Sequence, residues 1–241
     1  SILQASPEVH IPPENWKLGH TISLFQKYRW ILSWEELVHL VVGMHEHQGE
    51  RWFSEPPTDL VNDLVATSEE NQTLSEILDQ LYRFHGDQQS VAFNRWGDKT
   101  PMNVRFMHSI LDVFPEAKFI YMSRDVVDVV HSWIQTGYYD EVEDPALRWK
   151  RAAKNAEEFS SQYPDRLIRI RYEHLVRDPT QSVKHVCNFV GVSFDPSMLE
   201  RRSEGKVASE IDKHDHYAAV NDPISDKNIG KGHKNMPEKI K

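Results

Sequence analysis

Cysteine is nearly absent from this 241-residue sequence, and long apolar runs are absent altogether. Because Cys187 is the single cysteine, no intrachain disulfide can form, and a reducing compartment is favoured. The sequence has no run of about 18 apolar residues that could span a membrane. Its first ten residues, SILQASPEVH, also lack the basic and apolar regions of a signal peptide. We therefore expect a cytoplasmic protein with no membrane span in this sequence.

Positive charge is also in short supply. The 28 lysines and arginines are outnumbered by 37 aspartates and glutamates, so the formal net charge is −9. This balance argues against nucleic acid or heparin-like polyanions as the main partner. The histidine spacing gives only weak evidence for a metal site. Residues 45–47 and 214–216 each contain two histidines but no convincing third ligand. We expect neither a bound metal nor a nucleic-acid partner.

The length and the 39% hydrophobic content suit one α/β domain, which we expect to extend over residues 1–241. Apolar residues at helical spacing predict helices at 16–49, 73–85, 102–114, from 127 onward, at 144–162 and at 179–190. Apolar or alternating runs predict strands at 90–94, 119–122 and 167–172. Strands separated by helices favour a three-layer sandwich with a central parallel sheet.

The segment 118–133, KFIYMSRDVVDVVHSW, has the pattern of a buried strand followed by a helix, with Arg124 in the turn between them. Such a strand delivers Arg124 to the carboxyl edge of the sheet, where open α/β folds bind ligands. A guanidinium there suits a phosphate, and Ser132 follows Asp125 by about two helical turns, so its hydroxyl can point back to the strand end. The alternative is structural, with Asp125 capping the helix and pairing with Arg124.

Four short motifs resemble those of the sulfotransferases that use 3′-phosphoadenosine 5′-phosphosulfate. Residues 124–132, RDVVDVVHS, resemble the R-x-P-x-D-x-x-x-S motif for the 3′-phosphate, with Val126 in place of proline. WGDKTP at 96–101 is similar to the D/E-K-T/S-P element of the Golgi-type and bacterial branches, and RYEHL at 171–175 to R-Y-E-x-L. GKGHK at 230–234 loosely resembles the lysine-glycine loop that closes over the nucleotide.

This resemblance implies a P-loop nucleotide-binding-like sulfotransferase fold and 3′-phosphoadenosine 5′-phosphosulfate as the sulfuryl donor. It also implies that Arg124 and Ser132 hold the 3′-phosphate and that Tyr172 packs on the adenine. Core packing is the alternative for Tyr172. The loop expected to cover the nucleotide contains Lys231, Gly232 and His233. A solvated basic tail, including Lys239 and Lys241, is equally compatible with that segment.

The resemblance places Lys99 near the transferred group, where it would stabilise charge on the leaving phosphate. A surface ion pair between Lys99 and Asp98 is the structural alternative. Glu14, in HIPPEN at 10–15, matches the position of a carboxylate that takes the acceptor's proton in the similar branches. The alternatives for the base are His10, His20 and His108, since a neutral imidazole suits this role. Glu14 could also merely cap the helix that follows it.

The predicted function is transfer of the sulfuryl group to an acceptor hydroxyl by in-line displacement. The alternatives are a P-loop kinase-like phosphotransferase and a noncatalytic nucleotide-binding domain. The acceptor class stays open among sugar, lipid alcohol, phenol and small metabolite. Four tryptophans could line an acceptor pocket or serve helix packing: Trp16, Trp30, Trp34 and Trp52. We also expect that the family's first strand and its glycine-containing phosphate loop are missing from the sequence, since no glycine precedes Gly19.

Overall fold

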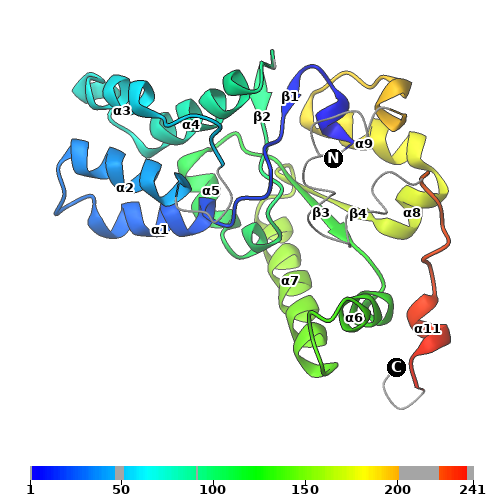
Figure 1. Cartoon of the computed structure of the whole chain (residues 1–241). Coiled ribbons are helices and arrows are strands. Elements are labelled where there is room, and N and C mark those ends of the chain that lie inside the picture. Colours follow the sequence, from blue (N-terminus) through cyan, green and yellow to red (C-terminus); the bar gives the residue numbers. More distant parts are fainter. Residues whose placement is uncertain (1, 47–51, 91, 201–222, 238–241) are drawn as a thin grey trace. The chain divides into compact units, whose positions relative to one another are not determined.

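The computed structural model describes residues 2–46, 52–90, 92–200 and 223–237, and its chain forms two compact units (Figure 1). The first unit consists mainly of Pro7–Ala117, and the second mainly of Lys118–Lys241. Both units contain a pair of parallel strands flanked by helices. The predicted α/β class with parallel strands is confirmed.

The first unit is largely helical. Its elements are β1 (Val9–His10), α1 (Leu18–Tyr28), α2 (Trp34–Glu46), α3 (Thr58–Val65), α4 (Leu74–Gln88), β2 (Arg95–Trp96), the 3-10 helix η3 (Pro101–Arg105) and α5 (Met107–Val113). β1 and β2 are parallel neighbours, with Val9 opposite Arg95. The helices α1, α2 and α4 bury aliphatic side chains against one another, which builds the core of this unit.

Three expectations for the first unit differ from the structure in their bounds or detail. The helical pattern expected over 16–49 forms two helices in its described part, which ends at residue 46, because Ser33 begins α2 with reciprocal bonds to Glu36. This capping box is visible as S-x-x-E in the sequence. The strand expected at 90–94 is displaced to Arg95–Trp96, since Ser90 takes a left-handed φ of 54°. The helix expected at 102–114 starts as a 3-10 turn and becomes α-helical only from Met107.

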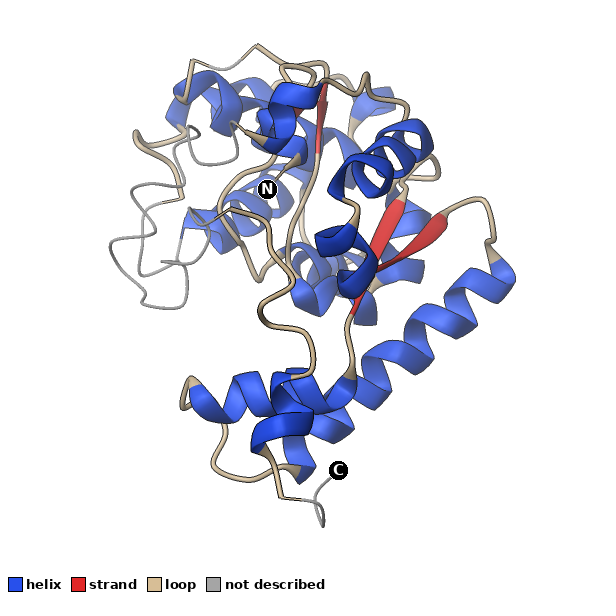
Figure 2. Cartoon of the chain, turned by 90° about the vertical axis from the view of Figure 1, so that its right-hand side faces the viewer, coloured by secondary structure: helices blue, strands red, loops and turns tan. Residues whose placement is uncertain are grey.

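The second unit begins with the strand–helix corner singled out in the sequence. Its elements are β3 (Phe119–Ser123), α6 (Val126–Gln135), α7 (Glu143–Gln162), β4 (Leu167–Arg171), α8 (Tyr172–Arg177), α9 (Pro179–Val190), the 3-10 helix η4 (Pro196–Leu199) and α11 (Lys231–Asn235). Figure 2, with strands in red, shows β3 and β4 side by side. The helix α9 has strong local signals in the sequence. It starts after its cap, Asp178, and ends at Gly191, which has a left-handed φ of 75°.

The register between β3 and β4 positions the residues that follow them. Ser123 pairs with Arg171, so the next residue of each strand, Arg124 and Tyr172, arrives at the same edge. Because the strands are parallel, this edge carries both carboxyl ends. The helix α11 packs against α6 in the same unit, as Figure 1 shows.

Candidate functional site

The guanidinium of Arg124 lies at the end of β3, packed over the ring of Tyr172 at 4.6 Å from its centroid. Its Nη2 donates a hydrogen bond of 2.7 Å to the carbonyl of Asn228 and lies 3.9 Å from the carboxylate of Asp128. Its Nε is buried and has no hydrogen-bond partner among the described residues. The group is therefore held in place and still has an unused donor, which suits an additional anionic ligand.

The turn after Arg124 is fixed by two carboxylates. Asp125 caps α6, because its Oδ1 accepts from the main-chain N–H of Asp128 at 3.1 Å, which is the capping role that the structural alternative gave it. The predicted alternative pairing of Asp125 with Arg124 is not found, since Asp125 contacts His233 at 3.0 Å instead. The main-chain N–H of Asp125 donates to Oε1 of Glu173 at 2.9 Å. This contact ties the start of α6 to the start of α8.

Ser132 lies two turns along α6 from Asp125 and is half-buried. Its carbonyl accepts from Thr136, whereas its hydroxyl has no hydrogen bond to any described residue. Tyr172 is half-buried as the first residue of α8. The nucleotide-binding roles of Ser132 and Tyr172 stay predictions. The guanidinium of Arg124 already stacks on the ring of Tyr172.

The glycine-containing segment around α11 lies against α6. The main-chain N–H groups of Gly230 and Gly232 each donate to Asp128, at 2.7 Å. Lys231 and His233 are exposed, and Lys239 and Lys241 lie outside the described residues. Sequence reasoning missed Asp128 and Glu173 as organising residues, although both stand inside motifs that it quoted.

A cavity of about 250 Å³ opens beside this segment. Two arginines, two histidines and three carboxylates line it: Arg171, Arg177, His174, His233, Asp125, Asp128 and Glu173. Oε2 of Glu173 is buried without a hydrogen bond and lies 3.5 Å from Nε of Arg171. Charges of both signs therefore face this cavity.

In the first unit, Lys99 and Glu14 come together although they are far apart in the sequence. The ammonium of Lys99 lies 3.5 Å from Oε2 of Glu14. The lysine side chain is 51% exposed and the glutamate 18%, so the pair is open to solvent mainly from the lysine side. A cation beside a carboxylate at an accessible surface can serve both charge stabilisation and proton removal.

The turn that carries Lys99 is anchored by buried hydrogen bonds. Asp98 accepts from the hydroxyl of Tyr82 at 2.6 Å and from Nδ2 of Asn103, so the alternative ion pair with Lys99 is not what holds it. Burial raises the pKa of Asp98, and these hydrogen bonds partly oppose that shift. Thr100 donates to the carbonyl of Asn15 at 3.0 Å. This last bond links the Lys99 turn to the segment of Glu14.

The alternative histidine bases differ in accessibility. His10 is buried, with Nε2 2.9 Å from Nδ1 of His85, and burial lowers its pKa. His20 and His108 are exposed. His10 is therefore a core histidine, while the other two stay open as alternatives to Glu14.

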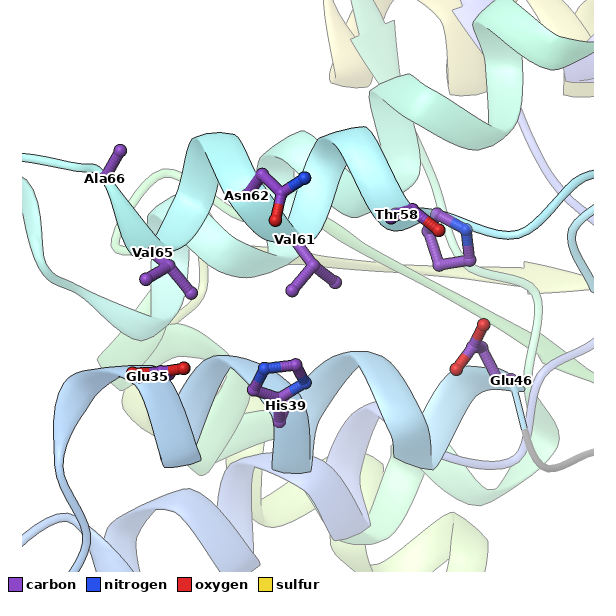
Figure 3. Close-up of a pocket in the computed structure, with 9 residues that line it drawn as sticks. Glu35, His39, Glu46, Thr58, Val61, Asn62, Val65 and Ala66 are labelled. Carbon is purple, nitrogen blue, oxygen red and sulfur yellow. The ribbon is translucent and has the colours of Figure 1, made fainter.

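A groove of about 410 Å³ lies between α2 and α3 (Figure 3). Glu35, His39 and Glu46 face the apolar side of α3 across it. None of the predicted site residues lines this groove.

The four tryptophans divide between packing and exposure. Trp34 donates to the carbonyl of Leu64 at 2.7 Å, and Trp52 is buried against His85. Trp16 and Trp30 are 48% and 79% exposed. Helix packing therefore accounts for Trp34 and Trp52.

No group of three or more metal-ligating side chains suited to a metal ion occurs within the described parts of the chain. His45 is buried, with Nδ1 2.9 Å from the Val41 carbonyl, and burial lowers its pKa to about 4. His47 and the residues 214–216 lie outside the described residues. Of the helices in the described segments, none has both the length and the apolar character needed to cross a membrane.

Comparisons with known proteins converge on one description. The family model described as "Sulfotransferase family" matches residues 1–196. Two relatives named "Putative protein-tyrosine sulfotransferase" come from Caenorhabditis briggsae, 25% identical over 171 residues, and Caenorhabditis elegans, 29% identical over 125 residues. These matches cover 68% and 49% of this chain, and 59% and 47% of the relatives. The chain thus spans about half the length of these relatives.

Two solved structures share the fold. The "Sulfotransferase Domain from the Synechococcus PCC 7002 Olefin Synthase" has a TM-score of 0.64 at 21% identity, covering 98% of this chain and 82% of that one. The "Sulfotransferase Domain from the Curacin Biosynthetic Pathway" has a TM-score of 0.50 at 20% identity, covering 82% and 70%. At such identities the likeness concerns the fold alone.

Proposed function

The chain belongs to the sulfotransferase family, and we propose that it moves a sulfuryl group from 3′-phosphoadenosine 5′-phosphosulfate to an acceptor hydroxyl by in-line displacement. The donor supplies the activated sulfuryl group. The observation that carries the proposal is the placement of Arg124 at the end of β3, stacked on Tyr172 and with one unused donor. A guanidinium beside an aromatic ring fits a phosphorylated adenosine, because it offers both charge-assisted bonds and a stacking surface.

The second unit supplies the nucleotide contacts in this proposal. Arg124 and Ser132 bind the 3′-phosphate, and Tyr172 packs on the adenine. The segment with Lys231, Gly232 and His233 covers the nucleotide. The support for these roles is that Arg124 already contacts Tyr172 and the carbonyl of Asn228, so the strand end and the covering segment meet at one guanidinium.

The first unit supplies the groups for the chemical step. Glu14 accepts the proton of the acceptor hydroxyl, and Lys99 stabilises the negative charge that develops on the leaving phosphate. Their separation of 3.5 Å keeps the carboxylate oriented beside a cation. The hydrogen bond from Thr100 to the carbonyl of Asn15 links the turn that carries Lys99 to the segment that carries Glu14. No metal is part of this mechanism.

The acceptor in this proposal is a hydroxyl on a sugar, a lipid alcohol, a phenol or a small metabolite. The names of the relatives concern protein tyrosine, so tyrosine-containing peptides are the first phenols to assay. A radiolabelled donor offered to members of each class would show which hydroxyl is modified.

The decisive experiment replaces Arg124 with alanine. We expect adenosine 3′,5′-bisphosphate to bind about 10- to 150-fold more weakly, the scale of a lost charge-assisted contact, while adenosine 5′-phosphate loses little. The matched control is Arg83→Ala, which removes an arginine whose ion pair with Asp79 lies on the surface of α4. Equal losses for both nucleotides would contradict the assignment of Arg124.

The same preparation separates the alternative functions. A magnesium-dependent ATPase activity would indicate a kinase-like phosphotransferase. Binding of the bisphosphate without transfer to any acceptor would indicate a noncatalytic nucleotide-binding domain. Transfer of label from the sulfuryl donor, without added metal, is the result expected here.

A further inference from the structure

The carboxylate of Asp128 has an unusual pair of partners. Its Oδ1 accepts from the main-chain N–H of Gly232 and its Oδ2 from that of Gly230, both at 2.7 Å. The side chain is 1% exposed, and its partners stand 102 and 104 positions further along the sequence. A buried carboxylate whose two oxygens each receive an N–H is a strong and specific attachment, because leaving it unpaired is costly.

The two glycines permit this attachment for different reasons. Gly230 has a left-handed φ of +74°, a conformation that L side chains rarely adopt. Gly232 lies so close to α6 that an added Cβ would stand 2.3 Å from the carbonyl oxygen of Val127. The backbone of this segment therefore rests directly on the backbone of α6, and no other residue type fits at 232.

The same segment reaches the guanidinium of Arg124. The carbonyl of Asn228 accepts from Nη2 of Arg124 at 2.7 Å, and Nε2 of His233 lies 3.0 Å from Oδ1 of Asp125. Asp128 is thus the buried member of a set of contacts that holds residues 228–233 against the strand end. His233 and Asp125 are more exposed, at 51% and 37%, so their contact contributes less.

We propose that Asp128 is a positioning residue that fastens residues 228–235 over Arg124, and that release of this attachment sets how fast the nucleotide leaves. The inference rests on the proposed function, since it assigns regulation to the same nucleotide site. Detaching the segment requires the loss of both N–H bonds to Asp128. Exchange of nucleotide is slow while the attachment is closed and fast once it opens.

The first test needs no nucleotide. Asparagine at position 128 keeps the shape of the side chain but presents an NH₂ group to one of the two main-chain donors. In Asp128→Asn, we expect hydrogen exchange of residues 228–235 to accelerate about 10-fold or more, with exchange in β3 and β4 unchanged. Unchanged exchange at 228–235 would overturn the attachment itself. Accelerated exchange throughout the second unit would reveal a general loss of folding instead, and would overturn the specific role of Asp128.

The second test measures dissociation of adenosine 3′,5′-bisphosphate by stopped flow. Gly232→Ala leaves Asp128 and Arg124 chemically intact but forces the segment away from Val127. We expect Asp128→Asn and Gly232→Ala each to raise the dissociation rate about 10-fold, and the double variant to do no more than the stronger single one. The matched control is Gly43→Ala in α2, where an added Cβ meets nothing within 4 Å. Additive effects of the two substitutions would contradict a shared attachment.

The two tests separate the two proposals. If the unaltered protein does not bind the bisphosphate, the proposed function fails, while hydrogen exchange still decides whether Asp128 fastens the segment. If the bisphosphate binds and Arg124→Ala weakens it selectively, but both variants release it at the original rate, the proposed function stands. The role assigned to Asp128 is then wrong.

Discussion

The region around Lys99 and the region around Arg124 hold their charged groups in different ways. The buried carboxylate beside Lys99, Asp98, is held by two side chains, Tyr82 and Asn103. The buried carboxylate beside Arg124, Asp128, is held by the main-chain N–H groups of two glycines.

This difference has a consequence for mutation. A main-chain partner is present whatever residue occupies the position, so the second region depends on few side chains and on glycines that allow close approach. A side-chain network depends on every member. We therefore expect substitutions near Lys99 to alter turnover and pH dependence, and substitutions near Arg124 to alter nucleotide binding and release.

The largest expected effect is that of Glu14→Gln. Removal of the proposed base should lower turnover about 10²- to 10⁴-fold and flatten the rising limb of the pH–rate profile, while donor affinity stays nearly unchanged. Glu46→Gln, an exposed carboxylate on α2, is the control that should retain turnover. Near-normal turnover in Glu14→Gln would move the role to His20 or His108.

Lys99→Ala should lower turnover about 10²- to 10³-fold, because it removes stabilisation that acts mainly in the transition state. Nucleotide affinity, measured by calorimetry, should change far less than the turnover. Lys154→Ala, which removes a lysine 71% exposed on α7, should behave like the unaltered protein. A loss of affinity as large as the loss of turnover would make Lys99 a binding residue. The two regions would then not differ in whether they act on turnover or on nucleotide binding.

His45 makes the first unit sensitive to acid. Burial lowers its pKa in the folded state to about 4, so below pH 6.5 the unfolded state binds a proton that the folded state rejects. Stability is therefore lost as the pH falls from about 6.5 towards 4. From pH 7.5 to 5, this histidine alone should reduce the free energy of unfolding by roughly 2 kcal/mol.

Denaturant melts of His45→Gln should show a weaker dependence on pH than those of the unaltered protein. His39→Gln, on the exposed side of the same helix, should keep the original dependence. Contributions of other groups, such as the raised pKa of Asp98, are shared by all three proteins and cancel in the comparison. An unchanged pH dependence in His45→Gln would contradict this account.

Two helix caps, one in each unit, give the prediction with the smallest expected effect. Ser33 caps α2 in the first unit, and Asp178 caps α9 in the second by accepting from the N–H of Gln181 at 3.0 Å. Ser33→Ala and Asp178→Ala should each cost about 1 kcal/mol of stability. Hydrogen exchange should localise the effect of each substitution to its own unit. Equal acceleration in both units would show that they unfold as one.

Much of the second unit was predictable because its signals are local. The apolar run before Arg124, the cap formed by Asp125, and the Asp178-Pro179 start and Gly191 end of α9 all act within a few residues. The first unit was harder. The capping box at Ser33 was readable but hidden within a continuous helical pattern, and α3 (Thr58–Val65) was too short to stand out.

The sequence by itself determined the α/β class, the family and the delivery of Arg124 to the end of a strand, since strand periodicity, caps and motif order are carried by neighbouring residues. Only the tertiary structure decided that Lys99 lies beside Glu14, that Arg124 stacks on Tyr172, and which glycines Asp128 holds. These pairings depend on strand register and on backbone approach across up to 104 positions of sequence. No local pattern encodes such distances, because packing between elements sets them.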